Sequence, residues 1–141
     1  MSLHKTTGVP VYFNDLRQLD TENMIWTRPR IAGTVPTARY MHSASRLQSG
    51  NLCVYGGWGK GGCQSNDLIK DSKAFTIHIL DTKTMTWSLP RKLGRKETKH
   101  LYSHSVCNAS DSTIFLYGGF DGRQALRDFY VVNFEFQQLD Y

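Results

Sequence analysis

Apolar and polar residues alternate along several short stretches of this chain. The clearest example is Phe75, Ile77 and Ile79, which are separated by the polar residues Thr76 and His78. A period of two is the pattern of a β-strand that buries one face. Helical spacing is weak throughout, and the nearest helical candidate, 66–74, is short. The pattern therefore predicts an all-β chain.

Turn-forming residues separate these stretches. The segments 20–23 and 81–84 each begin with Asp-Thr. The carboxylates of Asp20 and Asp81 can accept hydrogen bonds from backbone amides two residues on and so close a hairpin. We expect units of four antiparallel strands. The first strand is expected at 40–47 and 102–108, and the second at 51–56 and 113–118. The third is expected at 14–19, 74–80 and 127–132, and the fourth at 24–27, 85–89 and 136–140.

The chain repeats itself in two registers. Residues 19–29 match residues 80–90 at an offset of 61. The positions shared there are Leu19/Leu80, Asp20/Asp81, Thr21/Thr82, Met24/Met85, Trp26/Trp87 and Pro29/Pro90. At an offset of 62, Tyr followed by a glycine pair recurs, and a histidine stands fourteen residues before each pair. The positions shared there are Tyr40/Tyr102, His42/His104, Ser43/Ser105, Tyr55/Tyr117, Gly56/Gly118 and Gly57/Gly119.

A third, degraded copy closes the chain. Residues 128–133 align with residues 15–20. Leu139 then falls where the other two copies have Trp26 and Trp87. We therefore expect the last unit to have lost its tryptophan.

Together these features resemble the kelch repeat. The resemblance rests on an aromatic residue and Gly-Gly after the second strand, Asp six residues before Trp in the last hairpin, and His on the first strand. The linker from Trp26 through Pro29, Gly33, Pro36 and Arg39 to His42 is also similar to that family, and the likeness runs from about Asn14 to Leu139. It implies four-stranded antiparallel blades and a partial β-propeller.

The repeat length implies an incomplete ring. At 61 residues per repeat, 141 residues hold about 2.3 blades, whereas propellers use roughly 4–8. We expect a tail at 1–10, the last hairpin of an incomplete blade at 11–28, a complete blade at 29–90 and a second blade, degraded at its last strand, at 91–141. An open end would expose an apolar blade face, so we expect the chain to self-associate. Three copies would supply about seven blades.

The repeated residues are expected to hold the blades together. Glycines without Cβ let a neighbouring ring or backbone approach closely, and an indole fills such a space. We expect Trp26 and Trp87 to be buried and His42 and His104 to be hydrogen-bonded core histidines. The glycines expected to be structural are Gly56, Gly57, Gly118 and Gly119.

The composition is that of one globular domain. Of 141 residues, 40% are hydrophobic and 21% charged, which is ordinary for a folded chain of this size. No run approaches the ~18 apolar residues of a membrane-spanning helix. The N-terminus also lacks the apolar stretch of a signal peptide. We expect a cytoplasmic protein, with a nuclear location as the alternative.

The cysteines and the net charge exclude only a few kinds of site. Cys53, Cys63 and Cys107 form no Cys-x-x-Cys pair, so they predict neither a disulfide framework nor a zinc site. The formal net charge is +5, and basic residues gather at 91–96. That run is either a solvated loop or a patch for acidic peptides, phosphates or nucleic acid.

Several motifs suggest other chemistry, but each lacks a requirement. The glycine-rich stretch 56–62 has no hydroxyl after Lys60 and no following helix, both of which a phosphate-binding loop needs. His100 and His104 would lie roughly 13 Å apart on a strand, too far to share one metal ion. The basic run has no interleaved aromatics of the kind that bind nucleic acid. We expect no enzyme activity, metal or cofactor, and neither a nucleic acid nor a membrane partner.

The resemblance implies capture of a protein or peptide by loops on one face. The loops that join the fourth strand to the first carry Arg39, Tyr40 and Met41, then Leu101, Tyr102 and Ser103. The loops that join the second strand to the third carry Trp58, Lys60, Gln64 and Ser65, then Asp121, Arg123 and Gln124. Arg39, Lys60 and Arg123 favour an acidic or phosphorylated ligand. Leu101 departs from the arginine at position 39, which weakens that preference in the second unit.

Two other functions stay open. The chain could be a regulatory or substrate-recruiting segment of an enzyme, such as a phosphatase or a ubiquitin-ligase component. It could also be a structural scaffold in a cytoskeletal or trafficking assembly. The loop between Gly57 and Asp81 spans 24 residues, whereas its counterpart between Gly119 and Asn133 spans 14. A longer loop in a repeat often serves a binding face, but it can equally be a neutral insertion.

Overall fold

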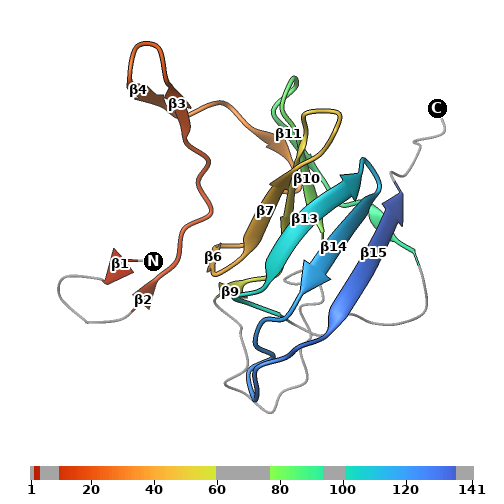
Figure 1. Cartoon of the computed structure of the whole chain (residues 1–141). Coiled ribbons are helices and arrows are strands. Elements are labelled where there is room, and N and C mark those ends of the chain that lie inside the picture. Colours follow the sequence, from red (N-terminus) through yellow and green to blue (C-terminus); the bar gives the residue numbers. More distant parts are fainter. Residues whose placement is uncertain (1, 4–9, 60–76, 94–100, 136–141) are drawn as a thin grey trace.

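The computed structural model describes residues 2–3, 10–59, 77–93 and 101–135. Every regular element in these ranges is a β-strand (Figure 1), so the all-β prediction is confirmed. In chain order they are β1 (Ser2–Leu3), β2 (Pro10–Val11), β3 (Gln18–Asp20), β4 (Ile25–Thr27), β5 (Ala32–Gly33), β6 (Arg39–Tyr40), β7 (Ser43–Arg46), β8 (Leu52–Tyr55), β9 (Trp58–Gly59), β10 (His78–Asp81), β11 (Thr86–Ser88), β12 (Arg91–Lys92), β13 (Ser105–Ser110), β14 (Thr113–Tyr117) and β15 (Phe129–Glu135).

The first blade is the antiparallel sheet β7-β8-β10-β11, with β5 added in parallel along β11. Its four strands are the four predicted for this repeat. The predicted first strand at 40–47 is divided, because Met41 takes a left-handed backbone with φ of 56° between β6 and β7. Ser103 has a φ of 55° at the same place in the next repeat.

The second blade has the sheet order β12-β15-β14-β13. Its third strand was predicted at 127–132, but β15 continues to Glu135. The reason is that Phe134 extends the buried alternation and Asn133 accepts a hydrogen bond from the Thr113 hydroxyl instead of opening a turn. The short strand β12 pairs with the far end of β15, and the predicted fourth strand at 136–140 lies outside the described residues.

Hairpin turns are closed by aspartate in the way the sequence predicted. The Oδ1 atom of Asp81 accepts backbone N–H bonds from Lys83 at 2.8 Å and Thr84 at 3.0 Å. The same atom of Asp20 accepts from Glu22 at 2.9 Å and Asn23 at 3.2 Å. Both repeats therefore carry the same turn.

The hairpin β3–β4 projects from the body of the molecule (Figure 1). Trp26 pairs across it with Leu19 and is 64% exposed. The expectation that Trp26 is buried was therefore wrong, because no further strands cover this hairpin in the described part of the chain. Trp87 holds the equivalent position in the first blade and is 7% exposed.

The main core lies between the two blades. Strands β7 and β13 lie side by side (Figure 1). The first blade contributes Cys53, Tyr55, Ile77 and Ile79. The second contributes Leu101, Ile114, Leu116, Val132 and Phe134. A smaller cluster of Val54, Leu80 and Trp87 lies on the other face of the first blade, with Leu16, Ile31, Val35 and Leu52 against it.

Candidate protein-interaction surface

The second glycine of each pair packs against its own blade. A methyl group at Gly57 would lie 2.8 Å from Cβ of His42 and 2.9 Å from the carbonyl oxygen of Tyr40. At Gly119 the corresponding distances, to His104 and Tyr102, are 2.8 and 3.0 Å. The φ angles are +99° and +95°. Only glycine combines this backbone with this clearance.

The first glycines of the two pairs have different neighbours. A methyl group at Gly56 would lie 2.5 Å from Cε1 of His104 and 2.5 Å from the carbonyl oxygen of Leu101, both in the second blade. At Gly118 the nearest atom is the carbonyl oxygen of Leu126 at 3.3 Å. The space beside Gly56 is thus filled by His104 and Leu101 of the second blade, whereas among the described residues no following blade lies beside Gly118.

The two repeat histidines have different surroundings. His104 is 7% exposed and stands edge-on to Tyr55, with ring centroids 5.4 Å apart. Burial lowers the pKa of His104 to about 4, against an opposing effect of the Tyr55 backbone. Neither ring nitrogen makes a well-formed hydrogen bond within the described structure. His42 is exposed, so the expectation that it is a core histidine was wrong.

Arg39 is buried, which argues against its predicted role as a ligand contact. It is 8% exposed. Its guanidinium donates to the carbonyl oxygen of Gly56 at 2.9 Å, and to the carbonyl and hydroxyl oxygens of Thr37 at 3.0 and 3.1 Å. Leu101 takes the same position in the second blade and is 1% exposed. The Arg39 side chain therefore holds the Gly56–Gly57 loop from inside, and the Leu101 carbonyl accepts a hydrogen bond from the Gly57 amide at 2.9 Å.

Five aromatic side chains line the loop ends of the two blades. Tyr40 pairs with Trp58 through β6 and β9, and Tyr102 pairs with Phe120 through an isolated bridge. The rings of Trp58 and Tyr102 meet edge-on at 5.0 Å and join the two blades. The rings of Tyr102 and Phe120 are 5.4 Å apart. Tyr12 stacks on Tyr40 at 5.4 Å and completes the set, which we call the aromatic row.

Sequence reasoning found three members of the aromatic row and missed Tyr12 and Phe120. A signal for Phe120 was available, because it follows Gly119 as Trp58 follows Gly57. Tyr12 had none, since its place depends on the hydrogen bond from the Arg39 amide to the Phe13 carbonyl, 3.2 Å long. All five rings of the row are half-buried.

The remaining predicted contacts fall into three groups. Met41 and Ser103 are exposed, and the Ser103 amide donates to the Met41 carbonyl at 3.0 Å, so they tie the blades together. Asp121 caps a turn by accepting from the amides of Arg123 and Gln124 at 3.0 and 2.9 Å. The side chains of these last two residues are exposed. Lys60, Gln64 and Ser65 lie outside the described residues.

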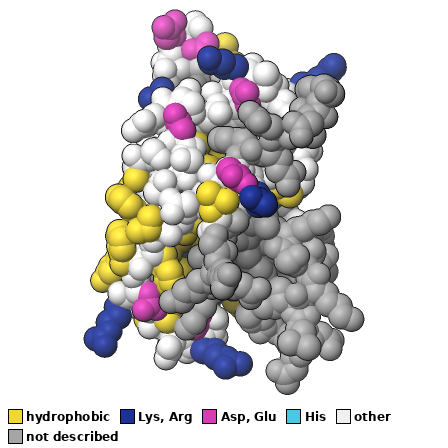
Figure 2. Space-filling view, turned by 90° about the vertical axis from the view of Figure 1, so that its right-hand side faces the viewer, with side chains coloured by type: hydrophobic (Ala, Val, Ile, Leu, Met, Phe, Trp, Pro, Cys, Tyr) yellow, Lys and Arg dark blue, Asp and Glu magenta, His cyan; other side chains and the backbone are white. Residues whose placement is uncertain are grey.

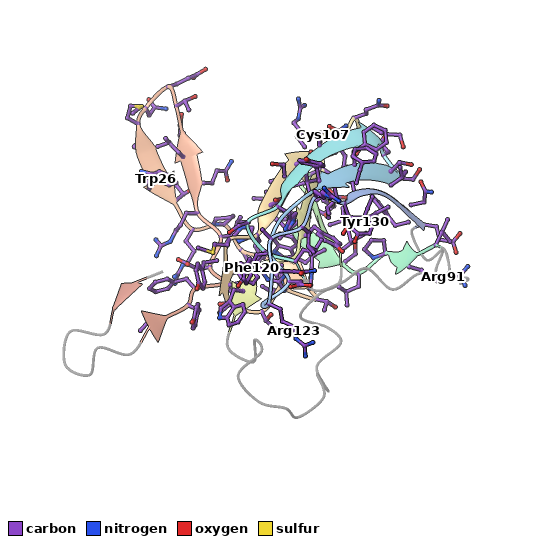
Figure 3. All side chains as sticks on the ribbon, turned by 60° about the horizontal axis from the view of Figure 1, so that its bottom comes forward. Trp26, Arg91, Cys107, Phe120, Arg123 and Tyr130 are labelled. Atoms are coloured by element: carbon purple, nitrogen blue, oxygen red, sulfur yellow. The ribbon has the colours of Figure 1, made fainter. Side chains whose placement is uncertain are left out.

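Figure 3 shows how these residues are distributed. Phe120 and Arg123 lie near each other, whereas Trp26 stands apart on its hairpin. Arg91 lies away from both and forms an ion pair with Glu135. The first two residues of the basic run, Arg91 and Lys92, thus form β12. Residues 94–96 of that run lie outside the described residues.

Among the described residues, no three His, Cys, Asp or Glu side chains are grouped so that they could hold a metal ion. The same part of the chain contains no helix long and apolar enough to cross a membrane.

Comparison with known proteins agrees with the repeats. The model of the KLHDC2/KLHL20/DRC7 Kelch-repeats domain matches residues 5–140. The Rab9 effector protein with kelch motifs from Homo sapiens is 33% identical over 109 residues, which are 77% of this chain and 27% of that protein. Kelch domain-containing protein 3 from Bos taurus is 42% identical over 77 residues, covering 54% of this chain and 18% of the relative.

A third relative is named for a different activity. Rho GTPase-activating protein gacHH from Dictyostelium discoideum is 35% identical over 81 residues, which are 57% of this chain and 5% of that protein. The chain thus spans about a quarter or less of the length of these relatives. The chain belongs to the kelch-repeat family.

Proposed function

We propose that this chain is a non-catalytic protein-interaction module that binds a peptide segment of its partner on the aromatic row. The observation that carries the proposal is the edge contact of Trp58 with Tyr102 at 5.0 Å, which continues one line of rings across two blades. Tyr and Trp supply large contact area with few rotatable bonds and dominate binding energy at interfaces.

The rings of the row are held in place before any ligand arrives. Tyr40 and Trp58 face each other on paired strands, and Tyr102 and Phe120 do the same in the next repeat. Contacts between rings at about 5 Å restrict their side-chain rotation. Less conformational entropy is then lost when a partner binds.

The charge available to a ligand is smaller than the sequence suggested. The Arg39 guanidinium already donates hydrogen bonds to Thr37 and Gly56. Arg123 is exposed, and its amide rather than its side chain holds the Asp121 turn. A preference for acidic peptides therefore rests on Arg123 among the described residues.

A second candidate function is recruitment of a substrate or partner to a larger enzyme. The likeness to a segment of a Rho GTPase-activating protein favours it. In that case the aromatic row would still be the contact surface, and the enzymatic reaction would belong to another part of the polypeptide. A purely structural scaffold has no specific observation in its favour.

Peptide selection tests the proposal directly. A phage-displayed library of random peptides would be selected on the purified chain, and the affinity of the recovered peptides measured for Trp58→Ala, Phe120→Ala and Trp26→Ala. We expect each of the first two substitutions to weaken binding at least tenfold, and Trp26→Ala, which removes an exposed indole far from the row, to leave it unchanged.

Thermal melting of each variant separates loss of fold from loss of contact. Binding that survives both row substitutions, or a selection that recovers no related peptides, would overturn the proposal. A threefold or greater loss with Arg123→Ala, confined to acidic peptides, would support the preference for acidic ligands. An equal effect on neutral peptides would refute that preference.

A further inference from the structure

A left-handed backbone recurs at the same place in both repeats, directly after a tyrosine of the aromatic row. Met41 follows Tyr40 with a φ of 56°, and Ser103 follows Tyr102 with a φ of 55°. This conformation brings the Cβ atom close to the following carbonyl oxygen, so it is unfavourable for residues that have a side chain. Each repeat therefore places a strained residue beside the proposed peptide site.

The fold explains the backbone at Met41 but not its side chain. The Ser103 amide donates to the Met41 carbonyl at 3.0 Å, which holds this backbone against the second blade. Glycine could take the same conformation without strain, and the second repeat takes it with serine. Met41 is nevertheless a large apolar residue, and it is 48% exposed. Strain that the fold does not require points to a function.

The exposure of Met41 belongs to its position in the blade. Ser103 holds the same position in the second blade, against which the first blade packs, and Ser103 is exposed too. The next residue, His104, is 7% exposed and lies beside Gly56 of the first blade. A neighbouring blade therefore covers the repeat histidine and leaves the left-handed residue accessible to a ligand.

Two other methionines have the same backbone for a different reason. Met24 and Met85, with φ of 56° and 54°, follow the turns that Asp20 and Asp81 close. A left-handed residue is usual at this place in a β-hairpin. Met41 instead lies between β6 and β7, which belong to different sheets and form no hairpin with each other. Hairpin geometry therefore accounts for the first two methionines and not for Met41.

Met41 adds an adaptable contact to the row of rings. The rings of Trp58 and Tyr102 restrict each other's rotation, since their centroids are 5.0 Å apart. Methionine is unbranched and polarizable, so it fits side chains of different shapes. Neither the rings nor Met41 carries a charge, and the guanidinium of Arg39 is buried against the Gly56 carbonyl. This surface therefore fits an uncharged, apolar side chain.

We infer that Met41 is an anchor of the peptide site, against which the bound peptide places one large apolar side chain, such as leucine, methionine or phenylalanine. This assignment rests on the proposed function, because Met41 is next in sequence to Tyr40 of the row. It adds which kind of peptide the site selects. The second repeat has Ser103 at the same position and offers no such contact, so one anchor residue is expected in the peptide.

A second apolar surface could take the same kind of residue. Figure 2 views the side where β15 lies and shows hydrophobic side chains gathered there. On this strand, Phe129 and Val131 are 60% and 53% exposed. Both lie in regular sheet pairing, so their exposure depends on what packs across the sheet and indicates no ligand. Val131→Ser therefore serves as a control for apolar contact away from the row.

Met41→Ser tests the side chain alone, because the chain already accommodates serine on this backbone at position 103. Met24→Ser is the matched control, since Met24 has the same φ of 56° and is 70% exposed on the separate hairpin. The affinity of peptides selected on the purified chain would be measured for each variant. We expect Met41→Ser to weaken binding at least fivefold, and Met24→Ser and Val131→Ser to change it less than twofold. The two methionine variants should melt at the same temperature.

The peptide supplies a second measurement. Its residues would be replaced by alanine one at a time, and each peptide measured against wild type and Met41→Ser. We expect one apolar position whose replacement weakens binding to wild type at least fivefold and binding to Met41→Ser less than twofold. Such coupling identifies a direct contact and would be absent if Met41 acted only on the fold. Equal losses in both proteins at every peptide position would overturn the inference.

Trp58→Ala separates failure of this inference from failure of the proposed function. If Trp58→Ala weakens binding and Met41→Ser does not, the row binds peptides without this anchor, and only the inference is wrong. If neither substitution weakens binding, or the selection recovers no related peptides, both are wrong. Loss of binding in Val131→Ser but not in Met41→Ser would place the apolar contact on β15 and overturn the inference as well.

Discussion

The imidazole of His104 stands edge-on to the ring of Tyr55, with ring centroids 5.4 Å apart and planes at 87°. The two side chains belong to different blades. They meet because Gly56 has no side chain to block the approach of the histidine. This contact shows how one repeat is fitted to the next.

Alanine at the first glycine of each pair should reveal the cost of this contact. Gly56→Ala and Gly118→Ala place the same methyl group on nearly the same backbone, with φ of +64° and +65°. The backbone strain is about 1–2 kcal/mol in each. We expect Gly56→Ala to lose about 1–3 kcal/mol more, because the methyl meets His104. Urea unfolding measures both, and equal losses would contradict the contact.

The two repeat tryptophans should differ sharply in their contribution to stability. Trp87 is 7% exposed, and Trp26 is 64% exposed. We expect Trp87→Ala to lower the free energy of unfolding by about 3–5 kcal/mol. Trp26→Ala should lower it by only about 0.5 kcal/mol, as is usual for exposed positions. A comparable loss in both variants would show that the hairpin is buried in solution.

Arg39 should matter for stability and leave ligand contact to its neighbours. Removing its guanidinium leaves the Gly56 and Thr37 carbonyls without their donor. We expect Arg39→Ala to lower the free energy of unfolding by about 2–3 kcal/mol. Arg17→Ala is the control, since Arg17 forms an exposed ion pair with Asp15, and exposed pairs contribute little to stability. Chemical denaturation of both variants decides the matter.

Stability should fall as the pH drops from about 6.5 to about 4. Burial lowers the pKa of His104 to about 4 in the folded chain, whereas the unfolded chain has an ordinary histidine near 6.5. The unfolded state therefore binds more protons in this window, and protonation favours unfolding. His104→Gln should flatten the pH dependence there.

The lowered pKa values of Asp20 and Asp81 act at more acidic pH, because these groups start from 3.8. They leave the window between pH 4 and 6.5 to the histidines. His42→Gln is the comparison variant, because desolvation and Arg39 lower the pKa of His42 as well, so that its share of the same window is measured beside that of His104. A pH profile that His104→Gln leaves unchanged would show that this ring is hydrated in solution.

Much of the fold could be predicted from local pattern. The hairpins around Asp20 and Asp81, the period of two before Asp81 and the glycine pairs all act through neighbouring residues. Their chemistry is the same wherever the segment lies. The end of β15 could not be predicted in this way, because Phe134 continues the strand by burial between the blades.

The candidate surface was harder to predict than the blades. Tyr40, Trp58 and Tyr102 stood out as loop residues, but the aromatic row exists only because the two blades pack side by side. Arg39 is of a residue type that often contacts ligands, but its side chain is buried and donates a hydrogen bond to the Gly56 carbonyl. Nothing in the sequence indicates which way a long polar side chain turns at the end of a strand.

The sequence alone therefore determined that this is a kelch protein with repeated four-stranded units, since turn and glycine chemistry act over a few residues. Tertiary structure decided which members of each equivalent pair are covered. Trp87 and Tyr55 have neighbours packed on them, whereas Trp26 and Tyr117 are open. The physical reason is that burial depends on what lies across the sheet, and similar local sequences carry no information about that neighbour.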